Sequence, residues 1–339
     1  PKNIWRFSVR SDSKTITEVS GQTFESDGSA KGNFKQYGLT DYKAQNIQAF
    51  QPFIANGLIS RDLSLLESAY DTNYCVDIMY GLTDKLSVGM SVPFLKRTLR
   101  YSQDYINTFT SLDQLASLGG IPGITGDDVI IPPNEAKGEG IGDIIVGFKY
   151  KIFSNLAVQS TAKTGVLKLG KDHTEISETA DNAEELVTGA TEDEYTLEIY
   201  YDFDFTKLPV KSALIYMHST PGHASGLDND FDIQKGDAYY LIFNTDLALS
   251  ETYKIDFETS YFLGNPDKKK ANDKWEEIPY SDVNTWMGKV QFNYMPAKYV
   301  HLWVGITAPL YNKAVGSLYN YPGRLNTDKI IDFGTHIFL

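Results

Sequence analysis

Apolar and polar residues alternate along residues 70–94, and this pattern recurs through much of the chain. One face of the first arm carries mainly apolar and aromatic residues: Tyr70, Thr72, Tyr74, Val76, Ile78 and Tyr80. The residues between them are mainly polar: Asp71, Asn73, Cys75, Asp77 and Met79. After a short turn at residues 81–85, a second arm repeats the alternation with Leu86, Val88, Met90, Val92 and Phe94. A period of two is typical of strands with one apolar and one polar face, so the pattern predicts a β-hairpin.

The length of the two arms predicts strands that cross a membrane. Each arm has about ten residues, which a tilted strand needs to span the hydrocarbon of a bilayer, and Tyr residues lie at its ends as they do at membrane interfaces. About twelve such segments follow one another, joined by short turns and long loops in alternation. We therefore expect an all-β fold, a transmembrane antiparallel up-and-down β-barrel of about 12 strands with short periplasmic turns and long extracellular loops. A soluble β-sandwich would explain the alternation but not this rhythm of loops.

Composition agrees with a single outer-membrane domain over residues 1–339. The mean hydropathy is −0.30, and no apolar run approaches the roughly 20 residues that a transmembrane helix needs. The net charge of −13 argues against a nucleic-acid partner, because proteins that bind nucleic acids are usually basic. The chain begins at Pro1 without a signal peptide, as expected of a processed protein. We expect it in the outer membrane of a Gram-negative bacterium, in contact with lipid and lipopolysaccharide, without a cofactor.

The first long loop, predicted at residues 11–66, contains apolar residues at near-helical spacing: Ile47, Phe50, Phe53 and Ile54. Leaving such side chains in water forgoes about 1.5–3 kcal/mol of burial energy each. We expect them to pack on the upper interior or the rim of the barrel, where the loop would narrow the entrance as a plug or lid. An ordered surface loop is the alternative. Further long loops are predicted at residues 98–141 and 167–194.

Charged residues recur on the faces predicted to point inward, because a charge facing lipid at mid-membrane costs about 2–4 kcal/mol. They could line a hydrated pore and tune its selectivity, or they could form a salt-bridge network that fills a narrow lumen. A barrel of about twelve strands has an intermediate diameter, so both interpretations stay open. The residues are Asp71, Asp77, Lys149, Lys151, Lys163, Glu198, Asp202, Asp204, Lys254, Asp256, Glu258, Lys289 and Asp332.

Three segments resemble a family of outer-membrane proteins named for phenol degradation by the meta pathway. The first runs from Tyr80-Gly81-Leu82-Thr83-Asp84-Lys85 to Val92-Pro93-Phe94. The second has Gly140-Ile141-Gly142-Asp143 ahead of Val146-Gly147-Phe148-Lys149-Tyr150, and the third is Lys163-Thr164-Gly165, where the family tends to have Pro-Thr-Gly. The resemblance implies an outer-membrane transporter that passes small molecules, hydrophobic ones included.

A possible hydrolytic site lies at His223 and Ser225, with Asn229 as the third residue. The spacing is similar to the His-x-Ser of a twelve-stranded outer-membrane phospholipase, in which a base activates the serine and a third group orients the base. Gly226 stands where that enzyme has its Asn, and the flanking residues are typical of a loop. We therefore expect no enzymatic activity.

Asp228, Asp230 and Asp232 alternate in the same segment and offer the oxygen ligands that Ca²⁺ takes. The EF-hand pattern fails, because Ile233 and Tyr239 replace its Gly and Glu, and a solvated acidic tip explains the run as well.

Three hypotheses on function follow. The first is a passive channel for small solutes, the second a closed structural or surface-contact barrel, and the third a lipid hydrolase that uses His223 and Ser225.

Overall fold

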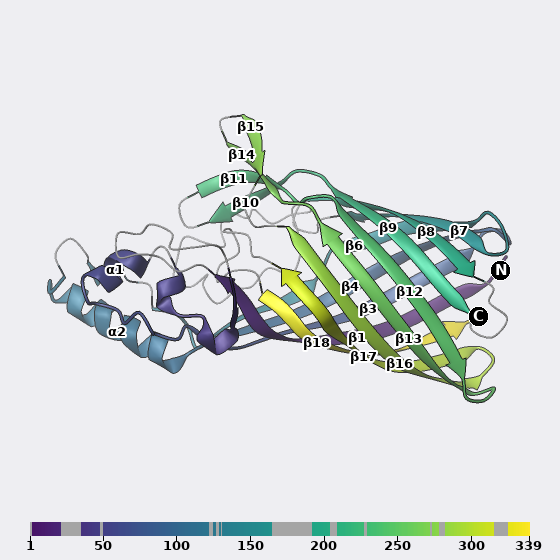
Figure 1. The fold of residues 1–339 in the computed structure, drawn as a ribbon, viewed down its shortest axis with the longest axis horizontal. Coiled ribbons are helices and arrows are strands. Elements are labelled where there is room, and N and C mark those ends of the chain that lie inside the picture. The colour runs from purple at the N-terminus through teal and green to yellow at the C-terminus, as the bar shows by residue number, and fades with distance from the viewer. Residues whose placement is uncertain are drawn as a thin grey trace.

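The computed structural model describes residues 2–21, 35–47, 50–121, 125–126, 129, 131–164, 192–203, 209–226, 229–271, 273–277, 282–314 and 325–339. Its main body is a closed antiparallel β-barrel of 12 strands (Figure 1). The barrel strands are β1 (Trp5–Gly21), β3 (Leu66–Gly81), β4 (Leu86–Tyr101), β6 (Ile144–Lys151), β7 (Leu156–Thr164), β8 (Glu194–Phe203), β9 (Val210–Ser219), β12 (Ala238–Ala248), β13 (Tyr253–Gly264), β16 (Val283–Ala297), β17 (Val300–Ala314) and β18 (Leu325–Phe338). The predicted fold class is confirmed.

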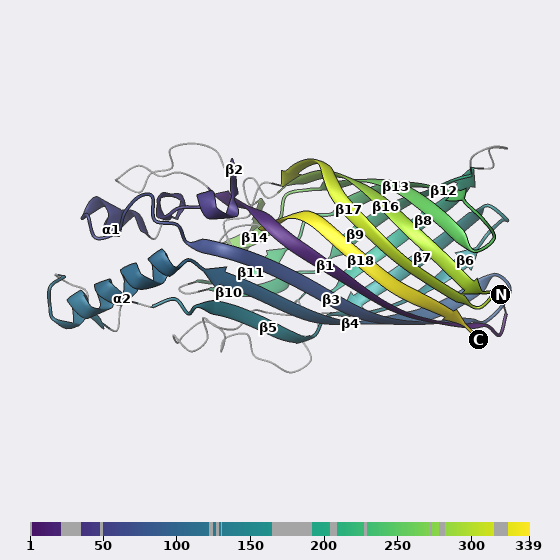
Figure 2. The same cartoon turned by 90° about the horizontal axis from the view of Figure 1, so that it is seen from below.

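The barrel closes between its first and last strands. β18 pairs with β1 along most of its length, and Figure 2 shows the two side by side. At the end of this seam, Trp5 and Leu339 exchange two backbone hydrogen bonds of 2.9 Å each. Closure satisfies the backbone groups that an edge strand would leave unpaired, which the interior of a membrane requires.

Alternation separates the two faces of the wall. Val76, Val146, Phe257 and Val304 are exposed on the outer surface, where they form part of a continuous apolar belt. The residues between them point inward, and Asp77 lines a cavity of the lumen. The period of two in the sequence is therefore the period of the barrel wall.

The two ends of the barrel differ. Short turns, such as residues 82–85 between β3 and β4, lie at the same end as both termini, which we call the turn end. The longer connections and the helices lie at the opposite end, which we call the loop end (Figure 1). This arrangement follows the alternation of short turns and long loops in the sequence.

Several strands run further toward the loop end than the sequence predicts. β1 continues to Gly21, although the predicted loop begins at residue 11, and Ser11 pairs with both Phe333 and Tyr74. Likewise β5 (Glu135–Ile141) lies in the predicted loop 98–141 and pairs with the upper half of β4. Beyond the apolar belt both strand faces carry polar residues, so the alternation ends while the ladder of backbone hydrogen bonds continues.

Above the loop end, two of the predicted loops form a helical layer whose core includes loop-end residues of β1, β3 and β4. The first contributes β2 (Lys35–Gly38), two 3₁₀ turns, η1 (Leu39–Asp41) and η2 (Ala44–Asn46), and α1 (Gln51–Ala55); the second contributes α2 (Gln103–Ser117). The Ser102 hydroxyl caps α2 by accepting a hydrogen bond from the Tyr105 N–H at 3.2 Å. Tyr105, Phe109, Leu112 and Ala116 then recur every three or four residues and are all buried. Among the described residues, no helix is long and apolar enough to span a membrane.

The connections between β9 and β12 and between β13 and β16 join into a second sheet at the loop end. Its strands are β10 (Gly222–Gly226), β11 (Asn229–Gln234), β14 (Lys268–Ala271) and β15 (Lys274–Glu277), in that order across the sheet. The two hairpins come from different loops and meet where β11 pairs with β14. Such pairing between distant segments leaves no local signal in the sequence.

Candidate functional site

The lumen holds two adjoining cavities. The loop-side cavity has a volume of about 680 Å³, and Lys163 and Glu194 line it near the loop end. The turn-side cavity has a volume of about 590 Å³ and reaches Lys85 and Asn155 in the turns. Ser87, Lys149, Tyr200 and Ile242 line both cavities. Among the described residues, the two cavities together extend from near the loop end to the turns.

One side of the loop-side cavity is a polar cluster on β1, β3 and β4. The Arg10 Nε lies 3.3 Å from one Asp77 carboxylate oxygen, and the Ser91 hydroxyl donates a hydrogen bond of 2.6 Å to the other. The Cys75 Sγ lies 2.9 Å from the Ser91 hydroxyl, and the residue is only 2% exposed. Both oxygens of Asp77 are thus engaged by neighbours on the barrel wall.

Glu198 on β8 is the centre of a second polar cluster. It accepts hydrogen bonds from the Gln159 amide at 3.0 Å and from the Tyr200 hydroxyl. The Lys149 ammonium lies over the Tyr200 ring, 3.6 Å from its centroid, in a cation–π contact. Lys149 and Tyr200 stand where the two cavities meet, so this contact forms part of the passage between them.

The lumen also has an apolar side, which sequence reasoning missed. Both faces of β9 are apolar, so alternation alone does not say which one points inward. Pairing with β8 decides it, because Ile215 lies opposite the inward Glu198 while Leu214 lies opposite the outward Ile199. The inward apolar residues of the loop-side cavity on β9 and β12 are Ile215, Met217, Tyr240 and Ile242.

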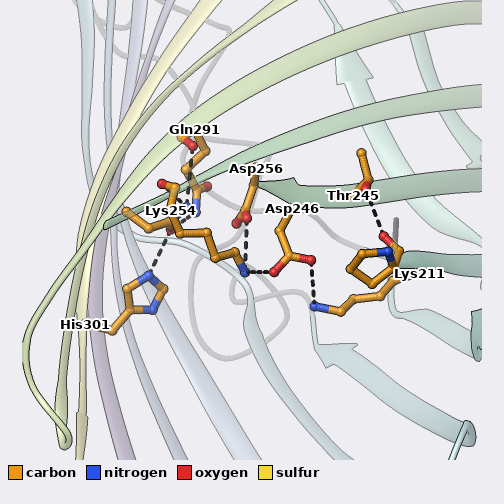
Figure 3. A network of polar contacts seen from close by, with 9 residues as sticks. Lys211, Thr245, Asp246, Lys254, Asp256, Gln291 and His301 are labelled. Atoms are coloured by element: carbon orange, nitrogen blue, oxygen red, sulfur yellow. Dashed lines mark hydrogen bonds and ion pairs between the residues drawn. The ribbon is translucent and has the colours of Figure 1, made fainter. Parts of the chain in front are cut away.

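Cross-strand ion pairs connect other parts of the inner wall (Figure 3). The Lys254 ammonium lies between two carboxylates, 2.8 Å from Asp246 and 3.0 Å from Asp256. The other carboxylate oxygen of Asp246 lies 3.9 Å from the Lys211 ammonium. These pairs tie β9, β12 and β13 together by side chains as well as by backbone hydrogen bonds.

Next to this network, β16 and β17 contribute a group of hydrogen-bonded side chains. Asn293 is 1% exposed, and its side-chain oxygen lies 2.7 Å from the Gln291 amide nitrogen and 2.8 Å from His301 Nε2. Because that oxygen only accepts, His301 donates its Nε2–H here. Buried polar groups of this kind hold the wall in one arrangement when all of them have partners.

The thirteen charges predicted to face the lumen divide into groups. Asp77, Lys149, Lys163 and Glu198 line the loop-side cavity, while Lys149, Lys151, Asp202 and Glu258 line the turn-side cavity. Lys254, Asp256, Lys289 and Asp332 form cross-strand ion pairs, and Asp71 pairs with Arg97 at 3.7 Å. Asp204 lies outside the described residues. Some of these charges therefore line the cavities, while others form ion pairs between neighbouring strands of the wall.

Arg6, Arg10 and His336 line the loop-side cavity although they are absent from the predicted set. The signal was present for the two arginines, because Arg6 and Arg10 alternate with the outward Trp5 and Val9 in the first strand. His336 shares a contact of 2.5 Å with the Ser8 hydroxyl across the closing seam. Only closure of the barrel brings these two ends of the chain together.

The apolar residues of the first loop lie away from the cavities. Ile47 and Phe50 are buried, and Phe53 and Ile54 pack against the same core cluster, which we call the outer cluster. The Phe50 ring lies 5.4 Å from that of Phe109 in α2, centroid to centroid. Phe50 therefore packs on α2, in a cluster that also includes Leu66 on β3 and Leu99 on β4 at the loop end of the barrel. Narrowing of the entrance by this segment stays a prediction.

The candidate hydrolytic and calcium residues lie in the second sheet. In the backbone register of β10 and β11, His223 is opposite Asp232, Ser225 opposite Asp230, and Gly226 opposite Asn229. The side chains of all these residues except Asp232, and residue Asp228 altogether, lie outside the described part of the chain. Asp232 lies 3.8 Å from Lys270. Within the described ranges, no group of three His, Cys, Asp or Glu residues is arranged to hold a metal ion.

Comparison with known proteins places the fold. No family model and no curated sequence matches the chain. Among solved structures, an outer-membrane channel from Pseudomonas putida F1 matches with a TM-score of 0.60, over 100% of this chain and 96% of that chain, at 9% sequence identity. The monoaromatic hydrocarbon channel CymD matches with a TM-score of 0.44 over 100% and 89%, at 9% identity. The toluene transporter TbuX from Ralstonia pickettii gives 0.43 over 99% and 90%, at 11% identity.

Of these three structures, the P. putida channel has a score high enough to indicate a shared fold. The match extends over nearly the whole of both chains, so it covers the barrel and its loop end together. It agrees with the sequence resemblance to a family of outer-membrane transporters. The chain has the fold of an outer-membrane β-barrel channel.

Proposed function

We propose that the protein is a passive channel that lets small solutes cross the outer membrane through its lumen. The observation that carries this proposal is the pair of adjoining cavities, which reach from Lys163 and Glu194 near the loop end to Lys85 in a turn. A barrel that served only as a scaffold would gain stability by filling this space with side chains. The loop end would face the outside of the cell and the turn end the periplasm.

The lining supports passage of solutes that are partly apolar. Ile215, Met217 and Ile242 replace the polar residues that line most of the inner wall, and they face the space through which a solute would move. The P. putida protein with the same fold is described as an outer-membrane channel, which supports transport in general. The outer belt would contact membrane lipid, and the acidic loops would meet lipopolysaccharide.

Conductance in a planar lipid bilayer tests the proposal. The refolded protein should give discrete current steps, and Ile242→Trp should reduce them because Ile242 lines both cavities. Phe243→Trp is the matched control, since Phe243 is the next residue on β12 and faces outward. A correctly folded protein without conductance and without solute uptake in liposomes would favour the closed structural barrel. Release of fatty acid from phospholipid, abolished in Ser225→Ala, would instead favour the lipid hydrolase.

A further inference from the structure

The loop-side cavity contains two cations, Arg6 and Lys149, that have no carboxylate within ion-pair distance among the described residues. Arg6, Arg10, Lys149 and Lys163 line it together with three carboxylates, Asp77, Glu194 and Glu198. Arg10 pairs with Asp77, and Lys163 pairs with Glu194 at 3.0 Å. Within the described part of the chain, neither Arg6 nor Lys149 makes an ion pair, so the cavity carries an excess of positive charge although the whole chain has a net charge of −13.

Of these two cations, Arg6 also has a donor without a hydrogen-bond partner in the described part of the chain. Its Nε–H is buried, and among the described residues it has no hydrogen-bond acceptor. Asp77 lies near enough for its charge to interact with Arg6, but its oxygens contact Arg10 and Ser91 and make no ion pair with Arg6 among the described residues. A guanidinium group presents a planar fork of donors that matches the two oxygens of a carboxylate. The donor set on this wall therefore fits an organic anion.

Lys149 strengthens the same preference. Its ammonium and the Arg6 guanidinium both line the cavity and lie near enough for their charges to interact. The charges of Glu198 and Asp202 also act on Lys149, but among the described residues neither carboxylate lies within ion-pair distance of its ammonium. An anion between the two cations would relieve their mutual repulsion.

The remainder of the cavity suits an apolar group. Ile215 and Met217 on β9, together with Tyr240 and Ile242 on β12, line the same space as the cations. A volume of about 680 Å³ lies within the range of small-molecule sites. Such sites combine apolar walls with a few polar groups that orient the ligand. Both features are present here.

We propose that the loop-side cavity is a binding site for a small monocarboxylate with an apolar body. The carboxylate would contact Arg6 with Lys149 nearby, and the apolar body would lie on Ile215, Met217 and Ile242. The proposal rests on the proposed channel function, because it names the class of solute that would pause at this point of the lumen. An uncharged hydrocarbon would leave the excess positive charge of the cavity without a counter-charge, and an organic cation would be repelled.

Titration calorimetry on the detergent-solubilised, folded barrel tests the site without requiring transport. Benzoate is the probe, benzamide has the same shape without the charge, and acetate has the charge without the apolar body. We expect benzoate to bind at least about tenfold more tightly than either of the other two, since each lacks one half of the recognition. Arg6→Gln should weaken benzoate binding by about tenfold or more, and Arg6→Lys should weaken it less.

Arg100→Gln is the matched control, because Arg100 pairs with Glu135 and lies outside the cavity lining. It should leave benzoate binding unchanged. Retained mobility of unheated samples on gels verifies that each variant is folded, and Ile215→Asn provides a second test by weakening benzoate but not acetate. Equal binding of benzoate and benzamide, or unchanged benzoate binding by folded Arg6→Gln, would overturn the proposal. Conductance without benzoate binding would contradict the binding site but not the channel. Benzoate binding without conductance would contradict the channel but not the binding site.

Discussion

Lys289 and Asp332 form an ion pair of 2.9 Å across the strand that separates them. Lys289 lies on β16 and Asp332 on β18, and the side chains meet over Gly305 on β17. A Cβ at position 305 would lie 2.8 Å from an Asp332 oxygen and 3.0 Å from Lys289 Cε. The absence of a side chain at this glycine therefore lets the two charges meet.

Replacing Gly305 should weaken this pair. In Gly305→Ala we expect the barrel to lose roughly 0.5–1.5 kcal/mol of unfolding free energy, because the flexible ends of Lys289 and Asp332 would have to move apart. Urea unfolding in lipid vesicles measures the change. Gly264→Ala is the control, since a Cβ there would meet its nearest neighbours at an ordinary 3.5 Å. Equal losses in both variants would show that the pair contributes nothing specific.

The facing of the first hairpin can be tested with spin labels. A label at Ile78 should be reached by a lipid-soluble quencher, and a label at Asp77 by a water-soluble one, because the Asp77 carboxylate contacts Arg10 and Ser91 on the inner wall. A shift of register by one residue would exchange the two faces. Exchanged accessibilities would therefore contradict the pairing of β3 with β4.

The outer cluster should depend on α2. Phe109 is buried in contact with Phe50 and Tyr105, so Phe109→Ala should cost about 3–5 kcal/mol of local stability. Limited proteolysis should then cut residues 103–117 faster while the barrel keeps its resistance to heat. Leu115→Ala on the exposed side of the same helix is the control. Loss of the barrel itself in Phe109→Ala would mean that the two parts do not unfold separately.

Alkaline pH should loosen the same cluster. Tyr42 is buried, and burial, with Tyr37 nearby, raises its pKa above the ordinary value of 10.0. The folded state thus favours the neutral phenol, and its contribution to stability is present below pH 10 and falls as the pH rises further. Protease resistance of residues 35–66, measured as the pH passes 10, should drop in the wild type and drop less in Tyr42→Phe. Tyr299→Phe at the turn end should behave as the wild type.

The orientation of the barrel predicts where protease acts on intact cells. Cleavage should occur between β1 and β3 or between β4 and β5, because these connections lie at the loop end. Residues 82–85 at the turn end should be cut only after the outer membrane has been opened. Cleavage of intact cells confined to the turns would reverse the orientation.

The sequence by itself determined the barrel wall. Membrane lipid on one side and a polar lumen on the other impose a period of two on every crossing strand. The sequence therefore predicted that Val76 faces outward and Asp77 inward. The lengths of the connections likewise indicated which end of the barrel is which. Short turns join neighbouring strands at one end, and long loops join them at the other. These are local constraints, and local constraints leave a pattern along the chain.

Tertiary structure decided everything that depends on pairing between distant segments. The inward facing of Ile215 followed from its register opposite Glu198, because both faces of β9 are apolar. The contact between Phe50 and Phe109 depends on the packing of two loops against each other. Arg6 and Lys149 line the same cavity only because the barrel closes. A side chain's burial energy is the same against any apolar surface, so the sequence gives no sign of which surface it will meet.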